Sequence, residues 1–252
     1  MAKKAKEKKG KREEGGEGGE PTCELEAAVP VTLNAGWGPV VDAVRRSRYL
    51  QALILLTVLG AFLRLFQLGT ASLWLDEAST LGLARESVTQ IWGSLTLGEF
   101  NPPLFYWIEH GMLVFGESEA VLRLVPAILG ILTIPVFYLI GKEILDRNTG
   151  LIAAALLAFS PFQLYYSQEA RAYAPMLFFF SIAFFFFLRL ISSWDRRDAA
   201  LFGIFSALAF WTHFYAFVPI LALFLFLLAV KAKEMGRDIR SAIPLGISIL
   251  AF

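Results

Sequence analysis

A series of long apolar runs constrains this chain more than any other feature of its sequence. Four runs occupy residues 49–68, 121–141, 150–166 and 174–191, a fifth covers 199–230, and another begins at 242. Each of the first four has about 17 to 21 residues, enough to cross a hydrocarbon core of about 30 Å at about 1.5 Å per helical residue. The pattern therefore predicts an all-α, polytopic integral membrane protein built as a helix bundle.

The distribution of charge supports a division into two parts. Charged residues make up 18% of the chain, below the roughly 25% of ordinary soluble domains, and many lie in the Lys-, Glu- and Gly-rich residues 1–20. We predict a largely disordered, cytoplasmic tail over 1–47 and a transmembrane module over 48–252. Because the chain stops inside an apolar run, we expect it to be the first part of a longer protein. The long polar tail also disfavours a cleaved signal peptide.

One apolar segment, residues 102–115, is too short to cross. Fourteen residues give about 21 Å of helix, and Glu109 and His110 lie near the middle, where an ionised acid is costly in lipid. Asn101 is a plausible N-cap, with Pro102 at the first helical position. We therefore predict an interfacial or re-entrant helix within an outer loop over 69–120.

The positions of the basic residues favour one orientation. If the tail is cytoplasmic and 199–230 is a hairpin of two short crossings, the loops rich in Lys and Arg all lie inside. The basic residues left outside or at outer ends of spans are Arg64, Arg85, Arg123 and Arg171. The hairpin is left open against a single long span, because residues 211–214 contain no Gly or Pro turn signal.

Three polar clusters fall on the same outer side, at residues 73–78, 101–106 and 165–173. Asp76 and Glu77 are neighbours, so on a helix their side chains diverge by about 100° and serve different purposes. The alternative is that both are an acidic cap on a helix over 78–87. In the third cluster Glu169 and Tyr173 share a helical face, although a solvated, tyrosine-rich loop is an equally good interpretation.

Other polar residues have ordinary explanations. Arg64 and Arg123 lie near outer span ends, where extension to lipid head groups is the default, with binding of a lipid phosphate as the alternative. His213 lies at the proposed hairpin tip and is more typical of an interfacial histidine than of a ligand. The single cysteine, Cys23, excludes an internal disulfide and a thiolate zinc site. The basic residues flank apolar runs rather than forming a face, so no nucleic-acid partner is expected.

Four motifs together resemble a known family. They are Trp-Leu-Asp-Glu at 74–77, Pro-Pro-Leu-Phe-Tyr-Trp at 102–107, Leu-Arg-Leu at 122–124 and Tyr-Tyr-Ser-Gln-Glu-Ala-Arg-Ala-Tyr-Ala at 165–174. Their order and spacing over about residues 50–230 are similar to the N-terminal half of GT-C membrane glycosyltransferases. The branch they most resemble is the protein O-mannosyltransferase and aminoarabinose transferase superfamily (glycosyltransferase family 39 and relatives). The family usually has His where Asn101 stands. The family's remaining helices and outer C-terminal domain are expected in the part of the protein that follows residue 252.

The resemblance implies an activity and a set of site residues. The expected reaction moves a sugar from a polyprenyl-phosphate donor to a protein, lipid or glycan acceptor on the non-cytoplasmic side, with inversion in a single displacement. Asp76 matches the family's catalytic acid and is the expected general base. The expected donor and phosphate contacts are Arg171, Glu169 and Arg123, and further substrate contacts are Glu77, Asn101, Tyr173 and His213. No metal ligand set and no cofactor beyond the sugar donor is indicated.

Two other classes of function remain open. A lipid or glycan transporter would use intramembrane charges and broken helices, whereas the charges here lie mostly at one face. In a non-catalytic membrane subunit, Asp76 and Glu169 would only cap helices.

Overall fold

The computed structural model describes residues 42, 44–94, 101–235 and 243–251. The described residues form α-helices and short 3-10 helices, with no strand among them, which confirms the all-α prediction. The charged tail predicted over 1–47 falls almost entirely outside the described residues, and its predicted disorder stays a prediction.

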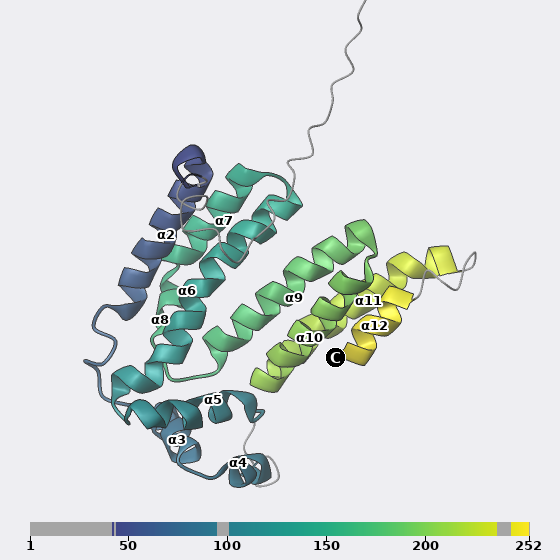
Figure 1. Ribbon diagram of the computed structural model, residues 1–252. Coiled ribbons are helices and arrows are strands. Elements are labelled where there is room, and N and C mark those ends of the chain that lie inside the picture. The colour runs from purple at the N-terminus through teal and green to yellow at the C-terminus, as the bar shows by residue number, and fades with distance from the viewer. Residues whose placement is uncertain (1–41, 43, 95–100, 236–242, 252) are drawn as a thin grey trace, which may run out of the picture. The chain divides into compact units, whose positions relative to one another are not determined.

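Three helices of the described part are long and apolar enough to span a membrane. They are α2 (Arg48–Leu65), α6 (Glu119–Ile144) and α9 (Tyr173–Ser193), and each covers one of the predicted runs. Serine hydroxyls cap the first two, because Ser47 accepts from the N–H of Leu50 and Ser118 from that of Val121. Figure 1 shows α2, α6 and α9 running side by side along the bundle.

The run at 150–166, predicted as one crossing, is not one helix. It forms α7 (Arg147–Phe159) and α8 (Pro161–Ser167), with a bend of 59° between them. Proline has no N–H to offer the carbonyl four residues earlier, so the helix ends before Pro161. Ser160 then caps the new helix, because its hydroxyl accepts from the N–H of Gln163.

The long run at 199–230 is a hairpin. Helix α10 (Arg196–Thr212) ends at His213, and the short 3-10 helix η2 (Phe214–Ala216) leads into α11 (Phe217–Met235). Phe202 packs on Phe224 at 4.9 Å between ring centroids. Phe202 lies well before the end of α10 and Phe224 well after the start of α11, so this contact requires the two helices to run in opposite directions. The last described helix, α12 (Ile243–Ala251), packs against α10.

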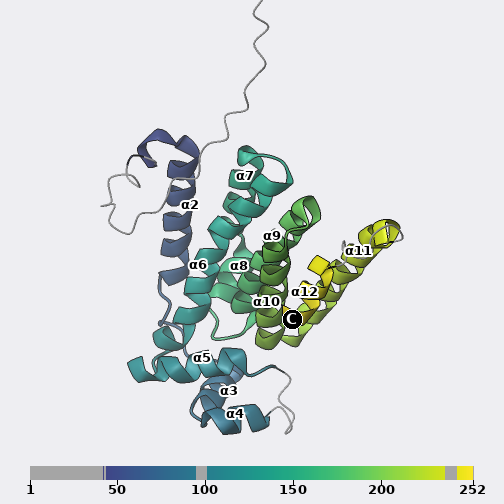
Figure 2. The same ribbon diagram turned by 45° about the vertical axis from the view of Figure 1, so that its right-hand side comes forward.

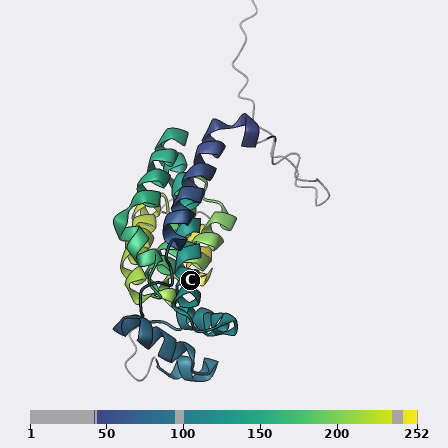
Figure 3. The ribbon, with the colours of Figure 1, turned by 90° about the vertical axis from the view of Figure 1, so that its left-hand side faces the viewer.

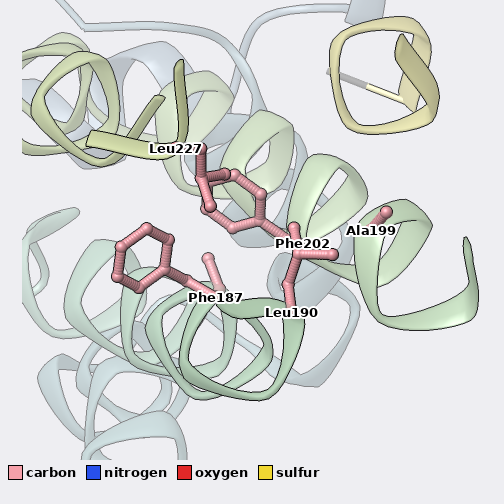
Figure 4. Packing of buried hydrophobic residues seen from close by; sticks show 6 residues of the cluster. Phe187, Leu190, Ala199, Phe202 and Leu227 are labelled. Atoms are coloured by element: carbon pink, nitrogen blue, oxygen red, sulfur yellow. The ribbon is translucent and has the colours of Figure 1, made fainter. Parts of the chain in front are cut away.

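Aromatic side chains fill the space among α9, α10 and α11. Phe187 and Leu190 of α9 meet Phe202 of α10 and Leu227 of α11, and all four are less than a tenth exposed. Figure 4 shows these side chains pointing toward one another from the three helices. Much of the phenylalanine in this part of the chain therefore serves helix packing.

The segment between α2 and α6 lies across one end of the helices. It contains α3 (Leu75–Ala84), α4 (Val88–Ser94), α5 (Leu104–Met112) and η1 (Leu113–Phe115), and it keeps this place in all three views (Figures 1, 2 and 3). Helix α5 is among the shorter apolar helices and not among the candidate spans, in keeping with the prediction for 102–115. The predicted cap is wrong, because the N-cap is Pro103 rather than Asn101; a residue before proline, here Pro102, is disfavoured in helical geometry.

Candidate functional site

A buried ion pair connects α3 to α6. Both carboxylate oxygens of Glu77 accept from Arg123: Nε donates to Oε1 at 2.8 Å and Nη2 to Oε2 at 2.6 Å. The two side chains are 1% and 6% exposed. A fork-on-fork pair of this kind has a fixed geometry, so it locks the start of α3 onto the start of α6.

All five N–H donors of Arg123 are used inside the protein. Besides the two bonds to Glu77, Nη1 donates to the carbonyls of Leu68 and Ala71, and Nη2 lies 3.4 Å from that of Ser72. The expected extension of this arginine to lipid head groups is therefore wrong. Its guanidinium faces inward and donates to backbone carbonyls of the segment that follows α2.

Glu77 also reaches a third element. Its Oε1 accepts from the backbone N–H of Ala170 at 2.8 Å, and its Oε2 lies 3.4 Å from the N–H of Trp74. Burial acts to raise the pKa of Glu77, but the hydrogen bonds from Arg123 and Ala170 outweigh it and hold that pKa below its ordinary value. An ionised Glu77 thus ties together α3, α6 and the turn after α8.

Asp76 faces a different direction from its neighbour. Its side chain is 39% exposed, and Oδ2 lies 3.6 Å from Nη2 of Arg171. Nη1 of Arg171 donates to the backbone carbonyl of Asp76 at 3.3 Å. Of the two acids in the first turn of α3, Glu77 therefore forms a buried ion pair, and Asp76 keeps an accessible carboxylate beside an arginine.

The turn between α8 and α9, residues 168–172, is packed rather than solvated. Ala170 is fully buried, and Glu169 is 6% exposed, so the interpretation as a solvated loop is wrong. Burial, together with the negative charge of Glu77, raises the pKa of Glu169. Glu169 consequently holds its proton to higher pH than an exposed glutamate.

Aromatic rings also lie beside Arg171. The guanidinium carbon lies 6.0 Å from the ring centroid of Tyr173, and that ring lies 5.3 Å from His213 and 4.9 Å from Tyr166. His213 comes from the hairpin turn after α10, so the hairpin brings a third segment to Arg171.

The hydrogen bonding of His213 defines its tautomer. The backbone N–H of Tyr215 donates to Nδ1 at 3.2 Å, which places the ring proton on Nε2 when the ring is neutral. Burial, and then the positive charge of Arg171, lowers the pKa of His213. At neutral pH the ring is therefore uncharged and has one N–H donor.

A cavity of about 420 Å³ opens beside the ion pair. Its polar lining includes Glu77, Arg123, Gln168, Glu169 and Tyr165, and its apolar lining comes from the end of α2 and from Trp74. It is large enough for a monosaccharide-sized group, but Asp76, Arg171 and His213 are not among its lining residues.

Asn101 lies at the chain leading into α5 and is buried. Its side-chain amide lies 3.4 Å from the hydroxyl of Tyr106. Tyr106 packs in one cluster with Ala172 of the turn. Asn101 is thus linked to the turn through the aromatic side chain of Tyr106.

Two residues at the site were missed from the sequence. Arg64 was expected to extend toward head groups, yet it is fully buried and donates to backbone carbonyls of α2 and α7. Gln168 lies at the end of α2, within 3.3 Å of three of its carbonyls. Pro161 was the signal that could have predicted the contacts of Arg64, because a proline breaks the helix and leaves backbone carbonyls without partners. The sequence offers no such signal for the contacts of Gln168.

In the described residues no group of three or more His, Cys, Asp and Glu side chains is arranged to hold a metal ion.

Comparison with known proteins gives one family and one relative. Residues 101–252 match the family described as dolichyl-phosphate-mannose-protein mannosyltransferase. An uncharacterized protein of Aquifex aeolicus (strain VF5) is 29% identical over 141 residues, a stretch that covers 52% of this chain and 28% of that protein. No solved structure matches the chain significantly.

Proposed function

Because the chain belongs to the dolichyl-phosphate-mannose-protein mannosyltransferase family of GT-C glycosyltransferases, we propose that it moves a sugar from a polyprenyl-phosphate donor to an acceptor. The observation that carries the proposal is the accessible carboxylate of Asp76, 3.6 Å from the guanidinium of Arg171. A base beside a phosphate-binding cation is the pair of groups that this transfer needs.

Asp76 is the proposed general base. The acceptor's nucleophilic atom attacks the anomeric carbon while its proton passes to the Asp76 carboxylate. The bond from the anomeric carbon to the phosphate oxygen breaks on the opposite face, so the product is inverted and the polyprenyl phosphate leaves. A positioned base of this kind contributes about 10²–10⁴-fold.

Arg171 is the proposed partner of the leaving phosphate. Among the described residues its guanidinium has one hydrogen bond, to the Asp76 carbonyl, and one longer ion pair to the Asp76 carboxylate. The other N–H groups stay available for phosphate oxygens, which guanidinium groups bind well. Arg123 has no donor left for a phosphate, so we assign it to positioning Glu77.

Two further residues fit contacts with the donor. The Nε2–H of His213, beside Arg171, is suited to donate to a phosphate or sugar oxygen. Glu169, whose pKa is raised by burial, faces the cavity as a group able to hydrogen-bond sugar hydroxyls. Tyr173 and Asn101 are proposed to shape the site through packing, and Glu77 through its ion pair.

The side of the membrane on which the site lies is part of the proposal. The basic tail, the basic residues that follow α6 and α9, and the basic end of α11 favour a cytoplasmic N-terminus. The segment holding α3, α4 and α5 then lies on the non-cytoplasmic side. The prenyl tail of the donor would stay in lipid while its phosphosugar head reaches Asp76.

One experiment separates the enzyme from its two rivals. The full-length protein in liposomes is incubated with a labelled polyprenyl-phosphate sugar and acceptor, and released polyprenyl phosphate is measured. Acceptor-dependent release supports the transferase. Movement of intact donor across the bilayer without release indicates a transporter. If neither release nor movement occurs, the protein is a non-catalytic subunit.

A further inference from the structure

Arg64 is a fully buried arginine in a helix that spans the membrane, and the proposed chemistry does not use it. Its side chain is 0% exposed. Burying a guanidinium in a membrane protein is costly unless its donors are satisfied, so its contacts should show what it stabilises.

Within α2, Nη1 of Arg64 donates to the carbonyl of Gly60, and its Nε has no hydrogen-bond partner among the described residues. Its other two hydrogen bonds lie at the break between α7 and α8. Arg64 Nη1 donates to the carbonyl of Ala158 and Nη2 to that of Leu157, both at 3.1 Å. In an unbroken helix, the N–H groups of residues 161 and 162 would fill these carbonyls. Pro161 has no N–H, and the 59° bend turns α8 away. A cation at the carboxyl end of α7 also faces the negative end of its dipole.

A second set of contacts leads from the end of α8 back to α2. Gln168, the first residue after α8, places its Nε2 3.1 Å from the carbonyls of Leu63 and Phe66 and 3.3 Å from that of Arg64. These belong to the last turn of α2 and its C-cap, Phe66, where carbonyls have no partner within the helix. Helix α2 therefore caps α7 through Arg64, and the end of α8 caps α2 through Gln168.

The third side of this joint is α6. A Cβ added at Gly130 would collide with the hydroxyl of Ser167 and lie 3.3 Å from Nε of Arg64. Only a glycine lets α6 approach α8 and Arg64 so closely. Ser167 is fully buried at this contact, one residue before Gln168.

The joint leads directly into the site. The residues after Gln168 include Ala170, whose N–H donates to Glu77, and Arg171, which pairs with Asp76. A change in the angle between α7 and α8 would move both contacts. We propose that Arg64 and Gln168 are a reciprocal pair of positioning residues, which hold the bend and thereby set the place of Arg171 against Asp76.

Thiol labelling tests the pair without relying on activity. In the full-length protein with Cys23→Ser, the reporter Ser167→Cys lies at the joint, and the matched reporter Ser206→Cys lies buried in α10. Each is labelled with N-ethylmaleimide in detergent. We expect Arg64→Gln and Gln168→Ala each to speed labelling at position 167 about tenfold, because buried hydrogen bonds are lost. Labelling at position 206 should change less than twofold.

Arg64→Lys serves as the conservative variant and should restore part of the protection at position 167, because an ammonium can still donate to the carbonyls of Leu157 and Ala158. If Arg64→Gln does not accumulate, Gln168→Ala tests the same joint with the arginine retained. Unchanged labelling at position 167 would overturn the proposal. Equal acceleration at positions 167 and 206 would also overturn it, since it would show a role in overall stability.

Discussion

At the scale of residues, the site depends on two adjacent acids with different surroundings. Glu77 accepts from Arg123 and from the N–H of Ala170 in a buried position, whereas Asp76 keeps an accessible carboxylate beside Arg171. The neighbouring side chains diverge because they are about 100° apart on the helix. Glu77 is therefore expected to control stability and Asp76 to control chemistry.

Replacing Glu77 with Gln should destabilise the protein by about 3–5 kcal/mol, because it leaves the buried Arg123 without a counter-charge. The pKa of Glu77 is lower in the folded protein than its ordinary value of 4.5. Its contribution is thus fully present above about pH 4.5 and is lost as the pH falls through the folded-state value. Thermal unfolding in detergent at several pH values measures both effects.

The control is Glu117→Gln, which removes an exposed pair with Arg85. That variant should change the unfolding temperature little. Equal effects of the two substitutions would contradict the structural role of Glu77.

Glu109 should make stability depend on pH in the opposite direction. It is fully buried in α5, neither carboxylate oxygen has a hydrogen-bond partner among the described residues, and burial raises its pKa to about 8. Between its ordinary value of 4.5 and about 8 the unfolded chain loses the proton first, so stability contributed by this group falls as the pH rises. Glu109→Gln should flatten that part of the profile, and exposed Glu86→Gln should not. If stability still declines with rising pH in Glu109→Gln, the decline is caused by other groups.

Arg171→Ala should lower kcat/KM for the donor by about 100-fold, because a preorganised cation at the leaving phosphate is lost. The KM for the acceptor should stay nearly unchanged, and Arg171→Lys should retain part of the activity. Arg85→Ala, at an exposed arginine, is the matched control. A larger effect on the acceptor than on the donor would speak against the phosphate role.

At the scale of elements, close helix contacts depend on glycine where two backbones meet. A Cβ added at Gly141 of α6 would lie 2.8 Å from both the Cα of Gly150 and the carbonyl oxygen of Thr149, whereas one at Gly82 of α3 would meet nothing within 4 Å. Because backbone atoms cannot yield as a flexible side chain does, the α6–α7 contact has no room for alanine.

Gly141→Ala should therefore lower the unfolding temperature, with a cost of about 1–3 kcal/mol for overpacking. Gly82→Ala should leave it unchanged or raise it slightly, because alanine favours a helix interior by about 0.5–1 kcal/mol. Unfolding followed by circular dichroism compares the two. A neutral Gly141→Ala would show that α6 and α7 separate without loss of stability.

The elements themselves were predictable to different degrees. The apolar runs predicted α2, α6 and α9 because a helix must satisfy its backbone inside lipid. The break before α8 was missed although Pro161 signals it, since the run is apolar on both sides. The hairpin at His213 carries no Gly or Pro; its reversal depends on packing such as that of Phe202 on Phe224, which a local pattern does not contain.

At the scale of the molecule, the site is assembled from distant segments. Asp76 and Arg171 are 95 residues apart in the sequence, and His213 comes from a third region. The resemblance of the motifs indicated which residues to compare, but not their partners. It grouped Arg123 with Arg171, whereas the structure uses every donor of Arg123 within the fold. Such a distinction depends on tertiary contacts.

The central claim is that Asp76 takes the acceptor's proton, with Arg171 at the leaving phosphate and the surrounding fold holding both in place. The most direct measurement compares Asp76→Asn with Ser79→Asn, on the exposed side of the same helix, in the full-length protein with a labelled polyprenyl-phosphate sugar. We expect Asp76→Asn to lower the single-turnover rate by at least about 100-fold, with donor binding and unfolding temperature kept, and Ser79→Asn to remain active. A single-turnover rate in Asp76→Asn equal to that of the unmodified protein would contradict the account.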